Sequence, residues 1–313
     1  VEVCVGLSMA SNLEELKLIT LGPSGGISIQ QKSSQALSTL LHWSVLNLRH
    51  LEVRAILSDV TAGDLYAGLA FAVELQSFEL HCFSLSAVAA RSLCSSITCL
   101  VNLKKLTLRS SVLDLQCLRI FGELLRKRDC RLIDLTLPNH CGDAGARIIS
   151  RSLSRNTVLE HFQVVGRITD KGLGYFTRML CNDKSLTSIA RSNHTLQSLK
   201  INDNIPRLGS NYAKFSDLLR LNTFRPKRGD LTTRQRSILK ILYHHYIFDV
   251  ELLLQWELKA MPLFLSWLEE ARDCPVAYDD RKQTRDHKLK IKHAKWSATY
   301  QFVRGSPGQF VEG

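Results

Sequence analysis

One six-residue phrase, Leu-x-x-Leu-x-Leu with conservative replacements, recurs seven times in the first two thirds of the 313-residue chain. Apolar residues fill positions 1, 4 and 6 of every copy, and the copies begin at Leu13, Leu48, Leu75, Leu103, Leu132, Leu159 and Leu196. From the second to the sixth copy the spacing is 27 to 29 residues. A fixed period of this length predicts a stacked-repeat solenoid, in which each unit buries its apolar face against its neighbours.

Each repeat divides into a strand and a helix. The leucine phrase is strand-like, because alternate side chains of a strand point to opposite faces. In the most regular copy the phrase LIDLTL is followed by the turn residues PNHCGDAG and then by apolar residues at helical spacing, namely Ala146, Ile149 and Leu153. The alternation of one strand with one helix predicts an α/β fold with parallel strands.

The turns contain residues with recognisable local roles. We expect Asp143 to open a helix by accepting hydrogen bonds from the N–H groups of its first turn, and Asp170 to do the same in the next unit. At the ends of these two helices, we expect Asn156 and Asn182 to adopt the left-handed conformation that turns the chain back into a strand.

The phrase LxxLxLxxN, followed by DxG, a helix of the form AxxxxxxLxxN and a period of 27 to 29 residues, resembles the ribonuclease-inhibitor-like class of leucine-rich repeats. The resemblance covers residues 11 to about 203 and is strongest in the units at Leu132 and Leu159. The phrases SLTSIARSNHTLQSL, LLLQWELKAMPLFLSWLEEA and ATYQFVRG are similar to expanded, uncharacterised families of such proteins in unicellular algae. The resemblance implies a right-handed horseshoe with strands inside and helices outside, acting as a protein-binding scaffold.

The repeats suggest two domains. Residues 1–203 are expected to form a leucine-rich-repeat solenoid of about seven units, with an insertion around the GPSGG segment at 22–26. Residues 1–12 resemble the end of a preceding unit, which predicts an open N-terminal edge. From Tyr212 onward amphipathic helical patterns predict a C-terminal cap over 204–313, and the charged segment 275–295 is expected to be a mobile loop within it.

Composition points to an intracellular protein without a membrane span. The chain is 45% hydrophobic and 22% charged, and it lacks the run of about 18 to 20 apolar residues that crosses a bilayer. Its nine cysteines form no CxxC pair, and we expect most of them to be buried thiols, Cys94, Cys117 and Cys181 among them. A cytoplasmic or nuclear location is therefore predicted.

The positive charge is concentrated toward the C-terminus. Of the net charge of +12, residues 204–313 contribute +7, because they carry 19 basic and 12 acidic side chains. Nine basic residues lie in 207–240 and seven in 281–295. These segments favour an acidic partner, which could be nucleic acid, an anionic surface or an acidic protein, although solvated helix faces have the same composition.

Catalytic and cofactor motifs are absent from the sequence. GPSGG lacks the Lys-Ser/Thr of a phosphate-binding loop, the cysteines and histidines have no zinc-ligand spacing, and no GxSxG turn occurs. Glu52 and Glu79 occupy equivalent positions in neighbouring repeats and could form a general acid and base pair, but a solvated concave face is the favoured explanation. We expect no enzyme activity, no cofactor and no metal site.

The predicted site is the concave strand face. Positions 3, 5 and 7 of each strand should point to this face, where strands about 4.8 Å apart would align their side chains in continuous polar rows. Its mixture of charge signs favours a protein partner over nucleic acid, which would need a mainly basic stripe. The residues expected to bind the partner are Lys17, His50, Glu52, Arg54, Glu79, His81, Lys105, Arg109, Asp134, His161, Gln163 and Lys200.

Overall fold

The computed structural model describes most of the repeat region and little of the last third of the chain. The described residues are 13–19, 31–43, 47–138, 142–165, 168–182, 184, 188–189, 191–201, 210–223 and 240. The chain divides into two compact units. Unit 1 comprises Val1–Leu180 and Thr195–Leu219, and unit 2 comprises Cys181–His194 and Arg220–Gly313.

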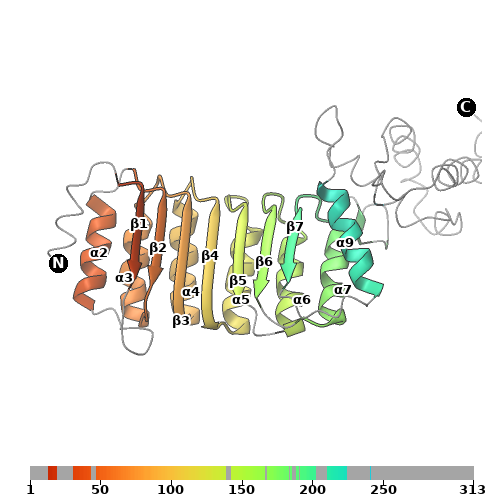
Figure 1. Cartoon of the computed structure of the whole chain (residues 1–313), viewed down its shortest axis with the longest axis horizontal. Helices are drawn as coiled ribbons and strands as arrows, with labels where there is room; N and C mark the ends of the chain where they lie inside the picture. Colours follow the sequence, from red (N-terminus) through yellow and green to blue (C-terminus); the bar gives the residue numbers. More distant parts are fainter. Residues whose placement is uncertain are drawn as a thin grey trace, which may run out of the picture. The chain divides into compact units, whose positions relative to one another are not determined.

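The described strands of unit 1 form one parallel sheet in chain order (Figure 1). They are β1 (Glu15–Ile19), β2 (His50–Arg54), β3 (Ser77–Ser84), β4 (Lys105–Val112), β5 (Asp134–Pro138), β6 (His161–Val165) and β7 (Ser198–Ile201). Each described strand after β1 pairs with the one before it in sequence, which is the topology of a repeat fold rather than of a doubly wound sheet.

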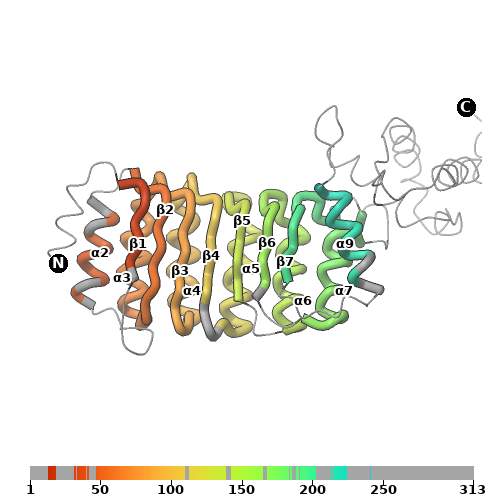
Figure 2. The backbone as a smooth tube through the Cα atoms, viewed as in Figure 1, coloured from red at the N-terminus to blue at the C-terminus, as the bar shows by residue number. Residues whose placement is uncertain are grey.

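Helices connect successive strands and lie together on one face of the sheet, as Figures 1 and 2 show. They are α2 (Gln31–Trp43), α3 (Asp59–Leu69), α4 (Ala87–Cys99), α5 (Leu115–Arg126), α6 (Gly142–Leu153) and α7 (Asp170–Leu180), and α9 (Ser210–Thr223) follows β7. The predicted α/β repeat with parallel strands is therefore confirmed. The described helices cover one face of the sheet, and no described helix lies on the other, which we call the helix-free face.

The leucine phrases form the core between the sheet and the helices. In the phrase that begins at Leu75, for example, Leu75, Phe78 and Leu80 at positions 1, 4 and 6 are each 0% exposed. Equivalent residues stand opposite one another in neighbouring strands, as in the pairing of Leu51 with Phe78. The prediction that these positions face the core is confirmed in all units, with half-buried side chains only at the two edge strands.

Polar caps start three of the helices. Ser58, Ser86 and Asp114 lie just before α3, α4 and α5, and each side chain accepts a hydrogen bond from the backbone N–H three residues later. Ser86 also donates its hydroxyl to the carboxylate of Asp59 in the preceding helix, with an O–O distance of 2.5 Å. Caps therefore stabilise single helices and also join neighbouring repeats.

The position predicted for Asp143, in the first turn of α6, is confirmed, but its predicted hydrogen-bond partners are wrong. Its two carboxylate oxygens accept hydrogen bonds from Thr169, at 2.9 Å from the backbone nitrogen and 2.6 Å from the hydroxyl. The carboxylate thus joins the start of α6 to the start of α7. A Cβ at Gly172 would lie 2.3 Å from Asp143 Oδ1, so the glycine of the Asp-x-Gly turn makes room for this contact.

The left-handed conformation predicted for Asn156 and Asn182 is also wrong, because no described residue except glycine has a positive φ. Asn156 acts through its side chain instead. Its amide nitrogen donates to the Leu125 carbonyl at 2.8 Å, and its carbonyl oxygen accepts from the N–H groups of Val158 and Leu159. A buried amide that satisfies three backbone groups turns the chain without a left-handed residue.

Unit 2 is described at Cys181–Asn182, residues 184, 188–189 and 191–194, Arg220–Thr223 and Lys240. Lys240 is 0% exposed, and its ammonium nitrogen donates to the Asn193 carbonyl at 2.7 Å. The expected cap beyond α9, the basic loop at 275–295, the GPSGG insertion and the N-terminal edge lie outside the described residues.

The described cysteines form no disulfide with one another. Five are buried, namely Cys82, Cys94, Cys117, Cys130 and Cys181, whereas Cys99 is exposed. Burial raises the pKa of the Cys94 thiol to about 12, so it stays protonated and packs as an apolar group. Among the described helices we find none with the length and hydropathy that crossing a membrane requires.

Candidate functional site on the helix-free strand face

The strand register places the predicted site residues in rows across the helix-free face. One row pairs Lys17 with Glu52 and Glu52 with Glu79, and a second pairs Arg54 with His81 and His81 with Arg109. Each of the twelve lies on a strand: Lys17 on β1; His50, Glu52 and Arg54 on β2; Glu79 and His81 on β3; Lys105 and Arg109 on β4; Asp134 on β5; His161 and Gln163 on β6; and Lys200 on β7.

Five of these residues make a connected network across β2, β3 and β4, which we call the charged cluster: Glu52, Arg54, Glu79, His81 and Arg109. Arg54 Nε donates to Glu52 Oε1, and Arg109 Nε donates to Glu79 Oε1 at 3.0 Å. The two glutamate side chains are 13% and 29% exposed, whereas those of Arg54 and Arg109 are 49% and 63% exposed. The carboxylates are thus partly covered, and the guanidinium groups present most of the accessible charge.

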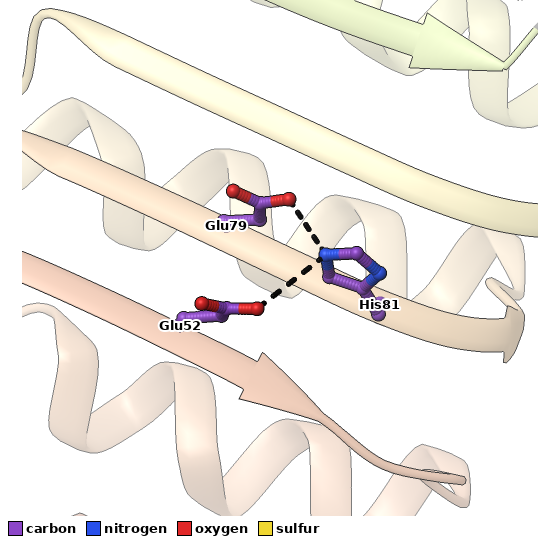
Figure 3. Close-up of side chains that lie close together, drawn as sticks. All are labelled: Glu52, Glu79 and His81. Atoms are coloured by element: carbon purple, nitrogen blue, oxygen red, sulfur yellow. Dashed lines mark hydrogen bonds and ion pairs between the residues drawn. The ribbon is translucent and has the colours of Figure 1, made fainter. Parts of the chain in front are cut away.

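His81 lies between the two carboxylates (Figure 3). Its Nε2 is 2.6 Å from Glu79 Oε1 and 3.8 Å from Glu52 Oε1. Because an ionised carboxylate only accepts hydrogen bonds, Nε2 carries the proton in the contact with Glu79. Partial burial by itself raises the pKa of Glu79, but the hydrogen bond and charge of His81, together with Arg109, outweigh it and hold that pKa below its ordinary value.

The remaining predicted residues lie outside this cluster. Lys17 pairs with Glu15 at 2.8 Å, and Lys105 approaches Asp134 at 3.9 Å. The other exposed residues of the predicted set are His50 on β2, His161 and Gln163 on β6, and Lys200 on β7. The structure therefore brings together five of the twelve residues and leaves the others distributed along the face.

The polar rows are interrupted between β4 and β5. Pairing of these strands stops at Thr107 and Thr136, so Arg109 and Pro138 are not paired as the repeat alignment predicts. Pro138 has no N–H to donate, which accounts for the end of the ladder there. Thr107, Thr136 and Pro138 are buried although they belong to the helix-free face. The expected continuous polar surface is thus wrong at this position.

A pocket of about 220 Å³ lies where β3 ends and α3 and α4 begin. Tyr66 lines it, and the buried Tyr66 hydroxyl makes no hydrogen bond with the described residues. Burial raises the pKa of this phenol above its ordinary value. Asp59 is the one charged residue in the lining, and its carboxylate accepts a hydrogen bond from Ser86. No sequence pattern predicts this pocket, because its residues are ordinary helix caps and core side chains.

Glu52, Glu79 and His81 are the described residues that could hold a metal ion, since their donor atoms lie within 4.8 Å of one another. All three are among the residues predicted to bind a partner, and the sequence predicts no metal site. A usable signal was present: glutamates at position 5 of two consecutive repeats, with a histidine two residues after the second. Ligand-spacing rules within one segment miss the cluster, because its members come from two repeats.

Comparison with models of known protein families and with curated proteins finds no match to this chain.

Proposed function

We propose that the chain is a ribonuclease-inhibitor-like leucine-rich-repeat protein that acts as a non-catalytic scaffold and binds a protein partner on its helix-free face. The 27- to 29-residue period and the parallel strand-helix repeat support this class. The class implies a horseshoe with this face on its concave side, and the amphipathic patterns over 204–313 support a helical cap. The cysteine thiols fit a cytoplasmic or nuclear location.

The charged cluster is the observation that carries the proposal. Glu52 and Glu79 hold the guanidinium groups of Arg54 and Arg109, so these donors lose little conformational freedom when a partner binds. Arginine is enriched among the residues that dominate binding energies, because its planar group can bond a carboxylate through two parallel hydrogen bonds. The partner surface is therefore expected to carry aspartate or glutamate side chains opposite the two arginines.

The chemistry of the cluster favours binding over catalysis. A general acid needs a carboxyl group with a raised pKa, whereas His81 and Arg109 lower that of Glu79 against the opposing effect of burial. The side chains of the charged cluster also form ion pairs with one another on an open strand face. Such a surface offers fixed charges to a partner rather than a reactive group to a substrate.

The test compares two variants with the same loss of charge. Arg54→Gln/Arg109→Gln changes the helix-free face, and Arg119→Gln/Arg147→Gln removes two exposed arginines from α5 and α6. A partner captured from the native cell with the wild-type chain is purified, and its dissociation constant is measured for each variant. We expect the face variant to bind at least about tenfold more weakly and the helix variant to bind like wild type.

Equal binding by the face variant and the wild type would contradict the proposal. So would a helix variant that loses affinity while the face variant retains it. Circular dichroism of all three proteins establishes that the comparison is made between folded chains.

A further inference from the structure

The three residues drawn in Figure 3 differ from the other described residues of the face because together they could act as ligands of a metal ion. Glu52 and Glu79 are directly paired in the register of β2 and β3, and His81 follows Glu79 on the same face of β3. Each residue is half-buried, and the two carboxylate oxygens and one ring nitrogen lie within 4.8 Å of one another. Positions on paired strands hold donor atoms more precisely than positions on loops do.

We propose that Glu52, Glu79 and His81 bind a divalent transition-metal ion of the zinc type. An imidazole nitrogen with two carboxylate oxygens suits zinc, whereas calcium and magnesium take oxygen ligands. Bonds of about 2.1 Å in tetrahedral geometry separate ligand atoms by about 3.4 Å. The distances from His81 Nε2, 2.6 Å to Glu79 and 3.8 Å to Glu52, lie on either side of this value. A fourth position remains open on the helix-free face for water or an added ligand.

Binding is an exchange of a proton for the ion. The Nε2–H bond of His81 breaks, the proton leaves to solvent, and Nε2 and one oxygen of each glutamate donate lone pairs to the metal. No group is oxidised or reduced. Arg54 and Arg109 now bond to the Oε1 atoms of Glu52 and Glu79, so they compete with the ion for the same acceptors.

The two arginines distinguish this site from a simple patch of negative charge. Their positive charges balance those of the glutamates, so the cluster does not concentrate cations by long-range attraction. Only an ion that forms strong directional bonds to imidazole and carboxylate can replace the existing contacts. The site is therefore expected to take Zn²⁺ or Co²⁺ and to leave Mg²⁺ and Ca²⁺ in solution.

The experiment uses the full chain after treatment with a chelator. Zn²⁺ is titrated calorimetrically and Co²⁺ by visible absorption, into the wild type and two matched variants. Glu79→Gln removes a proposed ligand, whereas Glu15→Gln removes a glutamate that also pairs with a basic residue two positions later on the same face. We expect a one-to-one binding component that Glu15→Gln retains and Glu79→Gln weakens by at least about tenfold.

Two further variants keep the result unambiguous. His81→Gln should remove the same component and the Co²⁺ absorption, while Arg109→Gln should bind Zn²⁺ several-fold more tightly because a competing charge is gone. Equal Zn²⁺ binding by the wild type, Glu79→Gln and His81→Gln would overturn the proposal, as would no binding by the wild type. Equal binding of Mg²⁺ would also overturn it. No partner protein is needed, so this test is independent of the proposed scaffold function.

Discussion

The strands β2–β4 and β5–β6 share one fold but present different helix-free faces. Beneath both parts lie the same buried leucine rows, with Leu51, Phe78 and Leu106 under the first and Leu135 and Phe162 under the second. Above them, the first part carries the charged cluster, while position 5 of β5 and β6 holds a threonine and a glutamine and position 7 of β5 holds a proline. The same buried rows therefore support two different sets of side chains on the helix-free face.

Core substitutions beneath the two parts of the face should destabilise the fold to a similar extent and more than any other change. Phe78→Ala and Phe162→Ala each remove an aromatic side chain that is at most 2% exposed, one beneath each part of the face. Each is expected to lower the free energy of unfolding by about 3–5 kcal/mol, because a cavity replaces a packed ring. Urea denaturation measures both values. A small loss at either position would contradict the claim that one core supports both parts.

Glycine substitutions in the helices that pack behind β2–β4 and β5–β6 should have smaller effects on stability, of opposite sign. A Cβ at Gly172 in α7 would lie 2.3 Å from Asp143 Oδ1 and 2.4 Å from Ile168 Cγ2, whereas a Cβ at Gly63 in α3 would meet nothing within 4 Å. Gly172→Ala should therefore destabilise the fold by about 1–3 kcal/mol. Gly63→Ala should stabilise it by up to about 1 kcal/mol, since alanine is the better helix former. Thermal unfolding of both variants checks the opposite signs.

Two aspartates near helix starts have different hydrogen-bond partners, one within its own helix and one in the next repeat. Asp114 accepts a hydrogen bond from the Cys117 backbone nitrogen of its own helix at 2.7 Å, whereas Asp143 bonds to Thr169 of the next repeat. Asp114→Ala is expected to cost about 1 kcal/mol near neutral pH, while Asp114→Asn keeps the cap and costs little.

The cost of Asp114→Ala should also depend on pH. The hydrogen bond from the Cys117 backbone is the main reason that the pKa of Asp114 lies below its ordinary value. The folded state therefore binds the proton less readily than the unfolded state, so this contribution is present above the unfolded-state pKa and is lost as pH falls through the folded-state pKa. Urea titrations across acid pH should show the wild type and Asp114→Ala converging. A difference that stays constant into strong acid would contradict this explanation.

Much of the fold was predictable because the leucine phrases fix both the buried face and the register. Positions 1, 4 and 6 meet the helices in every unit, and position 5 of β2 pairs with position 5 of β3 as the repeat alignment requires. The hydrogen bonds that side chains make between repeats were harder to predict. Asp143 and Asn156 have side chains that bond to neighbouring repeats, and local helix rules assigned them to their own turns.

The candidate site was predictable as a set of exposed positions but not as a cluster. Counting repeats places Glu52, Glu79 and His81 near one another, yet the contacts among them depend on side-chain conformations that no period specifies. The pairing of β5 with β4 ends before Pro138, because proline has no backbone N–H to donate. The assignment of all twelve residues to partner binding stays a prediction.

Substitutions of exposed residues on the helix-free face should change the free energy of unfolding least. Arg109→Gln in the charged part and Gln163→Ala in the neutral part are each expected to change the free energy of unfolding by less than about 0.5 kcal/mol, because exposed ion pairs contribute little. Chemical denaturation of the two variants provides the comparison. A loss of several kcal/mol from Arg109→Gln would show that the cluster stabilises the fold rather than remaining available for recognition.

The proposed scaffold function requires that a partner contact the charged cluster on the helix-free face. Hydroxyl-radical labelling of the full chain, with and without a purified partner, measures side-chain accessibility at each position. The proposal predicts that the partner reduces labelling of His81 on β3 and leaves labelling unchanged at Phe71, which is 55% exposed and follows α3. Unchanged labelling of His81 together with protection of residues in the helix layer would contradict it.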